Sequence, residues 1–155
     1  MSINAILIAT DFSENAQVAF EKAHELALQL GAKLHVLHVQ DESSLRVAIR
    51  EGLLDGQKTD EDLVKAVEAL TAERFATLLA TVDHANVAVD TVLRRGDSGK
   101  IIAEYAGETS SGIIVMGRRG AGVMNDMVRA VVGSVAESVI RRSPCPVLLV
   151  RPDHK

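Results

Sequence analysis

The stretch Ile113-Ile114-Val115-Met116-Gly117-Arg118-Arg119-Gly120 joins a run of apolar residues directly to a glycine-rich turn. Such a run is typical of a strand that is covered on both sides in a parallel sheet. A glycine has no side chain to hold an anion away, so backbone N–H groups in this kind of turn can approach phosphate oxygens closely. The stretch therefore predicts a parallel α/β fold and indicates a phosphate-binding loop.

Similar apolar runs alternate with segments of helical period along the rest of the chain. This alternation predicts an open, five-stranded parallel sheet with helices on both faces. The expected strands are Ile3 to Ala9, Lys33 to Val39, Val87 to Leu93, Gly112 to Met116 and Pro146 to Val150. The expected helices are Glu14 to Leu30, about Glu61 to Val82, Ser98 to Glu108 and Ser134 to Arg142.

Helix-ending signals agree with this pattern. Ser13 is expected to cap the first helix, Gly31 to end it, and Asp97 or Ser98 to cap the third. Residues 40 to 60 are longer than a usual connection. Within them Leu45, Ile49 and Leu53 stand at helical spacing and predict a short amphipathic turn.

Composition narrows the class of protein. The chain of 155 residues has the length of one domain, 1–155. Its composition, with 47% apolar and 25% charged residues, is that of a globular protein. The formal charge of −4 argues against nucleic acid as a partner. The first residues lack a basic n-region and a long apolar h-region, and no window of the sequence approaches about 20 uninterrupted apolar residues, so we expect no membrane span and a cytoplasmic protein. The single Cys145 is expected to be a buried thiol.

Ligands of open parallel sheets lie beyond the carboxyl ends of the strands. This rule makes four loops candidates: Thr10 to Ser13, Gln40-Asp41, Arg94 to Asp97, and the chain from Gly117 onward. Asp11 is either a turn residue or a carboxylate that binds a ligand's base or sugar, and the residues alone leave both interpretations open.

The glycine cluster after the fourth strand carries the strongest signal. Ser134 is expected at a helix N-terminus, where its hydroxyl and amide can donate to an anion, and Gly133 at a turn that favours a positive φ. The alternative is that these glycines only permit turns. Arg118 and Arg119 fit either solvated loop charges or phosphate clamps. The cluster consists of Gly117, Gly120, Gly122 and Gly133-Ser134.

Several other kinds of site are disfavoured. The first strand is not followed by Gly-x-Gly-x-x-Gly, and the chain lacks Gly-x-x-x-x-Gly-Lys-Ser/Thr. His35 and His38 stand three apart on a predicted strand and so face opposite sides, which excludes a shared metal. No nucleophile elbow is present, and no catalytic residue or metal site is predicted.

Four motifs together resemble the universal stress protein family over nearly the whole chain. They are Ile6 to Ser13, Leu37-His38-Val39, Ile114 to Gly120, and Gly133-Ser134-Val135-Ala136-Glu137 leading to Cys145 through Val150. The resemblance implies a Rossmann-like fold of the adenine nucleotide alpha hydrolase type, with strand order 3-2-1-4-5. It also implies ATP as ligand, with or without Mg²⁺, and a homodimer that pairs strand 146–150 antiparallel across a two-fold axis.

The same resemblance implies the contacts. The residue at Asp11 meets adenine, the backbone at Val39 supports the base, and Gly-x-x-Gly, nine residues and Gly-Ser/Thr wrap ribose and phosphates. Carried over, the nucleotide-binding residues are Thr10, Asp11, Val39, Met116, Gly117, Arg119, Gly120, Gly133, Ser134 and Val135.

The spacing departs from this pattern. Residues 121–132 separate Gly120 from Gly133 where the family has nine residues, which we interpret as a three-residue insertion. Either the insertion extends a helical stretch from Met124 to Val132 and rotates Gly133, or it bulges outward around Asn125 and Asp126; we favour the bulge.

Three functions remain open. The leading hypothesis is a cytoplasmic stress-response protein that binds ATP in a regulatory rather than catalytic role. The second is a nucleotide-free dimeric interaction module. The third is a slow ATP hydrolase or phosphotransferase, for which no general base is evident.

Overall fold

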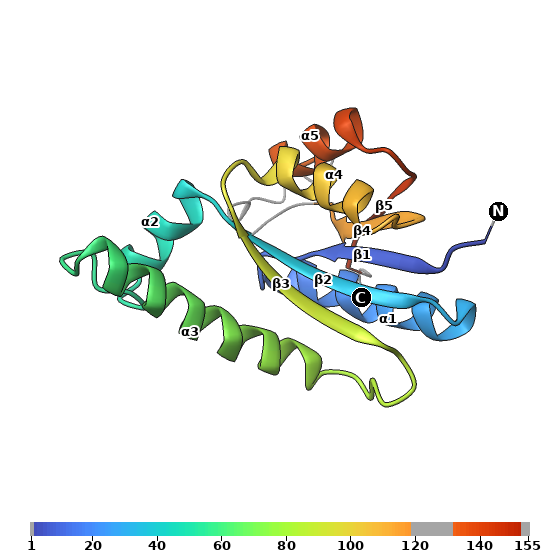
Figure 1. Cartoon of the computed structure of the whole chain (residues 1–155), viewed down its shortest axis with the longest axis horizontal. Coiled ribbons are helices and arrows are strands. Elements are labelled where there is room, and N and C mark those ends of the chain that lie inside the picture. The colour runs from blue at the N-terminus through green and yellow to red at the C-terminus, as the bar shows by residue number, and fades with distance from the viewer. Residues whose placement is uncertain (1, 119–131, 153–155) are drawn as a thin grey trace.

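A computed structural model describes residues 2–118 and 132–152 (Figure 1). Strands and helices alternate along the chain, as the apolar runs predict. The elements are β1 (Ala5–Ala9), α1 (Glu14–Leu30), β2 (Lys33–Gln40), α2 (Glu42–Arg50), α3 (Asp60–Leu79), β3 (Val89–Arg95), α4 (Ser98–Glu108), β4 (Ile113–Gly117), α5 (Ser134–Arg142) and β5 (Val147–Val150).

The five strands form one parallel sheet in the order β3-β2-β1-β4-β5. β1 is central: Leu7 lies opposite His35 of β2 on one side and Ile114 of β4 on the other. Every residue of β1 is buried, because the strand has neighbours on both edges and helices on both faces. The predicted fold class and strand order are confirmed.

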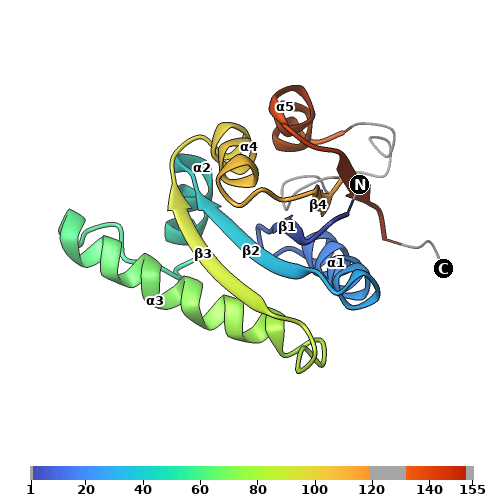
Figure 2. The same cartoon turned by 45° about the vertical axis from the view of Figure 1, so that its right-hand side comes forward.

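Two layers of helices cover the sheet (Figure 2). On β1, Ile6 and Ile8 pack in one core with Phe20 of α1 and Phe75 of α3. Leu7 points to the opposite face, where it packs with residues of α4 and α5. This alternation along one strand is the period of two that separates the faces of a sheet.

Three helices, α1, α4 and α5, have the bounds expected from the sequence, and side-chain caps fix the starts of α1 and α4. The Ser13 hydroxyl accepts from the N–H of Ala16 at 3.2 Å, and Gly31 ends α1 in the left-handed region at φ 61°. Of the two candidates for the third cap, Asp97 is the one used, because its carboxylate accepts from the N–H of Lys100 at 2.8 Å.

The long connection after β2 contains a complete helix, α2, followed by the start of α3. Asp41 caps α2 reciprocally with Ser44. Leu45 and Ile49 lie on one face of the helix, as an amphipathic turn requires, and pack on a small apolar cluster with α3. Leu53 is 45% exposed, so its expected place on this face is wrong. The helix ends at Arg50, and Leu54 is the residue that is buried after it.

Two further expectations need correction. The third strand starts at Val89 instead of Val87 and extends to Arg95, because β2 continues to Gln40 and pairs with β3 over its whole length. Cys145 is partly buried instead of buried. Its N–H donates to the Ser143 hydroxyl at 3.2 Å in the turn before β5.

Candidate functional site

The strand order reverses direction between β1 and β4. From β1 the chain leads to β2 on one side, whereas β4 and β5 lie on the other. Ala9 at the end of β1 lies opposite Met116 near the end of β4. The turns that follow these two strands therefore begin side by side, and such a reversal is where open parallel sheets bind ligands.

The turn after β1 has a defined hydrogen-bonded shape. The N–H of Phe12 donates to the Thr10 hydroxyl and the N–H of Ser13 donates to the Asp11 carboxylate, both at 3.0 Å. Phe12 has a φ of 63°, a left-handed conformation that is uncommon for a bulky residue. Asp11 is exposed at this turn while Thr10 is buried. The turn role of Asp11 is confirmed; its ligand role stays a prediction.

The backbone of Val39 points toward the same crevice. Thr10 donates its N–H to the carbonyl of Leu37 at 2.9 Å, so the peptide groups of Leu37 face β1. Peptide groups two residues apart in a strand face the same side, which directs those of Val39 the same way. Because β1 ends at Ala9 and β2 continues to Gln40, the N–H and carbonyl of Val39 point past the end of β1.

The two glycine turns meet beyond β4. Arg118 donates its N–H to Val150 at 3.0 Å, and its carbonyl accepts from the N–H of Gly133 at 2.9 Å. Arg118 and Gly133 therefore lie side by side at the end of β4. Met116 is buried beneath this junction and Gly117 leads into it.

Of the two arginines and the expected insertion, only Arg118 lies among the described residues. The Nε and Nη2 atoms of Arg118 are buried, so the interpretation of Arg118 as a solvated loop charge is wrong. Arg119, Gly120, Gly122 and the expected insertion at 124–126 lie outside the described residues.

Helix α5 begins at this junction with no side-chain cap. Gly133 is the capping residue, and Ser134 and Val135 follow it as exposed residues of the first turn. The N–H groups that open a helix carry a partial positive charge and favour an anion. Gly133 has φ −62° and ψ 154°, so the expectation of a positive φ is wrong.

Two groups that shape this edge of the sheet went unrecognised in the sequence. His38 is buried under the β1–α1 turn, with Nδ1 2.7 Å from the Thr10 carbonyl oxygen. Ser98 at the start of α4 donates its hydroxyl to the Asp41 carboxylate at 3.0 Å. Both contacts join residues far apart in the sequence, so no local spacing predicts them. The signal that the sequence does carry is that these residues lie at or just beyond the carboxyl ends of neighbouring strands.

The Asp41 carboxylate is stabilised in its charged form. Burial raises its pKa, but hydrogen bonds from Ser44 and Ser98 outweigh this effect and leave the pKa below its ordinary value of 3.8. The N–H of Ser44 donates to Asp41 at 2.7 Å. Asp41 therefore links the end of β2 to the start of α4 as an anion.

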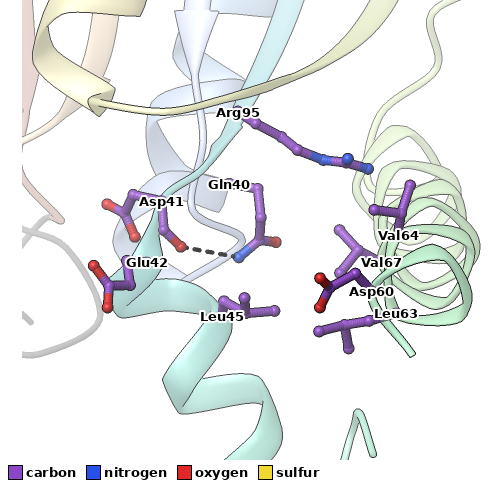
Figure 3. A pocket seen from close by; sticks show the side chains of 9 residues that line it. All are labelled: Gln40, Asp41, Glu42, Leu45, Asp60, Leu63, Val64, Val67 and Arg95. Atoms are coloured by element: carbon purple, nitrogen blue, oxygen red, sulfur yellow. Dashed lines mark hydrogen bonds between the residues drawn. The ribbon is translucent and has the colours of Figure 1, made fainter. Parts of the chain in front are cut away.

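A cavity of about 310 Å³ lies beside this edge, beyond β2 and β3 (Figure 3). Leu45 of α2 lies on one side of it and apolar residues of α3 on the other, with acidic groups at the rim. None of the predicted nucleotide-binding residues lines it. The lining residues are Gln40, Asp41, Glu42, Leu45, Asp60, Leu63, Val64, Val67 and Arg95.

The part of the chain that the structure describes contains neither a metal-binding cluster nor a membrane-spanning helix. Within residues 2–118 and 132–152, no three His, Cys, Asp or Glu side chains are grouped so that they could hold a metal ion. No helix in that part of the chain is long and apolar enough to cross a membrane.

An open parallel sheet with order 3-2-1-4-5 and turns meeting at its switch point defines the class: a Rossmann-like α/β protein. The model of the universal stress protein family matches residues 2–151. A Staphylococcus saprophyticus protein that carries this family's name is 32% identical over 155 residues, covering 99% of this chain and 87% of the relative. The chain belongs to the universal stress protein family.

Solved structures agree with the fold. The hypothetical protein MJ0577 has a TM-score of 0.78 at 23% identity, with all of both chains covered. Universal stress protein UspA from Lactobacillus plantarum has a TM-score of 0.68 at 26% identity, covering 97% of this chain and 99% of that one.

Two more structural neighbours were solved with adenine nucleotides. A universal stress protein in complex with cAMP has a TM-score of 0.59 at 20% identity, covering 97% of this chain and 98% of that one. The Archaeoglobus fulgidus protein in complex with dAMP has a TM-score of 0.63 at 22% identity, covering 97% of this chain and all of that one.

Proposed function

We propose that this chain binds an adenine nucleotide, ATP with Mg²⁺ as its counterion, between the carboxyl ends of β1 and β4. The observation that carries the proposal is the hydrogen bond from Gly133 to Arg118. It holds the uncapped start of α5 beside the end of β4, so that backbone N–H groups converge where phosphates would lie.

The other side of the crevice suits a nucleoside. In this proposal the Asp11 carboxylate accepts from the base or ribose, and the Val39 peptide supports the base edge. Thr10, Met116 and Gly117 line the floor between these groups and the phosphate side, where Ser134 and Val135 open α5. Arg119 and Gly120 are proposed to complete the phosphate side. The two neighbours solved with cAMP and dAMP support adenine as the base, since both ligands share it.

We further propose a regulatory role for bound ATP. A ligand that binds only the folded chain stabilises it by linkage, by about 2.7 kcal/mol at a hundredfold excess over Kd. Nucleotide level would thereby set the stability of the turns that form the crevice. We propose that the protein acts in the cytoplasm as a homodimer through β5, whose partly buried residues lie at the edge of the sheet.

Isothermal titration of the purified protein with ATP and Mg²⁺ tests the proposal, with GTP as the matched control for the base. Saturable one-site binding of ATP supports it. Heat changes no larger than those of buffer favour the alternative of a nucleotide-free dimeric module. Steady phosphate release in the same sample favours a slow hydrolase, and transfer to an acceptor favours a phosphotransferase.

A further inference from the structure

His38 is a polar residue in a buried place. It is 4% exposed and lies on the face of β2 that α1 and α3 cover. Its ring Nδ1 is 2.7 Å from the carbonyl oxygen of Thr10. A carbonyl oxygen only accepts hydrogen bonds, so Nδ1 must carry the proton in this contact.

The contact falls where the chain leaves the sheet. The N–H of Thr10 still pairs with β2, through Leu37 at 2.9 Å. The carbonyl of the same residue is turned to the His38 ring instead. The side chain of His38 therefore takes the place of a backbone hydrogen-bond partner for Thr10, the first residue of the turn.

The same ring also supports the strained residue of the turn. Phe12 has its ring centroid 4.7 Å from that of His38 and 5.2 Å from that of Phe75 in α3. The guanidinium of Arg74, a residue of α3, lies 5.7 Å from the centroid of the Phe12 ring. A left-handed conformation at a bulky residue costs free energy and persists only where its surroundings hold it. Packing of the Phe12 ring supplies that restraint.

We propose that His38 is the positioning residue of the β1–α1 turn, holding Asp11 at the crevice through Thr10 on one side and Phe12 on the other. As far as the ligand is concerned, the inference rests on the proposed function. The conformation of the turn can be measured without any ligand.

His35 provides a matched control on the same strand. It is also buried, but it faces α4, where its ring lies 6.2 Å from that of Tyr105. His35→Leu therefore removes a buried imidazole from β2 without touching the turn. His38→Leu removes the donor and His38→Asn keeps an N–H donor at the δ position.

The experiment measures three quantities on the full chain. The first is the ¹⁵N shifts of the His38 ring, which report whether Nδ1 or Nε2 carries the proton. The second is amide hydrogen exchange at Phe12 and Ser13 without nucleotide. The third is Kd for ATP, with Tm recorded for every variant.

We expect the Nδ1–H form in the wild type. We expect His38→Leu to speed exchange at Phe12 and Ser13 and to raise Kd, each by about tenfold, the effect of one hydrogen bond. His38→Asn should restore both to within about threefold of the wild type, and His35→Leu should change neither, even where its Tm falls equally.

An Nε2–H ring in the wild type would overturn the inference, as would unchanged exchange at the turn in His38→Leu. If the wild type binds no ATP, the proposed function fails. Exchange at Phe12 and Ser13 still decides whether His38 positions the turn.

Discussion

Gly133 donates its N–H to the carbonyl of Arg118 at 2.9 Å, although the whole of segment 119–132 lies between them in the sequence. This bond fixes where α5 begins relative to the end of β4. Because helix N-termini attract anions, it also fixes where phosphates would bind.

Gly133→Val should fold normally but bind ATP about ten- to hundredfold more weakly. Its φ of −62° and ψ of 154° are open to any residue, so the backbone is not strained. A branched side chain at the helix entry would instead fill the space that phosphates need and cost charged hydrogen bonds. Titration calorimetry with a melting curve checks both statements. Wild-type affinity in this variant would place the phosphates elsewhere.

Asp11→Ala should weaken ATP by about 1 to 3 kcal/mol, the cost of leaving a partner group unpaired. Asp11 also accepts from the N–H of Ser13 in the turn. Asp11→Asn is the control, because its amide oxygen keeps this acceptor while the charge is lost. If both variants bind ATP as the wild type does, Asp11 is a turn residue only.

Gly99→Ala should destabilise the protein by about 1 to 3 kcal/mol, the usual cost of overpacking. A Cβ at Gly99 would lie 2.1 Å from the Ser138 hydroxyl oxygen and 2.5 Å from its Cβ, so α4 and α5 would have to separate. Gly107→Ala on the same helix is the control, since a Cβ there meets nothing within 4 Å. We expect that change to be stabilising by about 0.5–1 kcal/mol. Urea unfolding of both variants measures the difference.

The free energy of unfolding should fall as the pH drops through about 6.5. Burial lowers the pKa of His38, and Arg74 adds to this, whereas the hydrogen bond to Thr10 and the charges of Asp11 and Asp41 oppose it. A lowered folded pKa means that the unfolded chain takes up the proton first, so stability is full above the unfolded value of 6.5 and is lost below it.

Urea unfolding between about pH 8 and about pH 5 checks this sign. His38→Asn should flatten the slope in that window. Part of the slope should remain, because burial and Lys33 also lower the pKa of His35 despite Asp90. Asp41, whose pKa is lowered from 3.8, contributes stability that is lost only at more acidic pH. A steeper slope in His38→Asn would contradict the assignment.

Leu149→Lys should shift sedimentation toward the monomer. β5 is the last strand in the sheet order, and Val147, Leu148 and Leu149 are only partly buried within one chain. Unpaired apolar edge strands are usually covered or paired with another chain. Leu30→Lys is the control, because Leu30 is apolar and 50% exposed at the far end of α1. A dimer that survives Leu149→Lys must use another surface.

The sequence predicts best those features that local chemistry decides. Ser13, Gly31 and Asp97 mark helix ends through hydrogen bonds to near neighbours, and α1 and α4 have the predicted bounds. Periodicity likewise predicts that Leu45 and Ile49 share one face of a short amphipathic turn, and in the structure that face packs with α3. The strand order came from the family resemblance and not from the periodicity.

Features that depend on tertiary contacts could not be predicted this way. The bounds of β3 are set by how far β2 extends beside it. Leu53 carries the helical period of α2, but the helix ends before reaching it. The conformation of Gly133 depends on its bond to Arg118, and the role of His38 depends on a turn 28 positions away.

The most direct test of the central claim is a titration of ¹⁵N-labelled protein with ATP and Mg²⁺, followed residue by residue through backbone amide shifts. We predict saturable shifts at the Thr10 to Ser13 turn, at Val39 and at Ser134-Val135, because these lie around the crevice between β1 and β4. Residues around the cavity beside α2 and α3, such as Leu63 and Val67, should stay unchanged. No shifts at saturating ATP, or shifts confined to that cavity, would contradict the account.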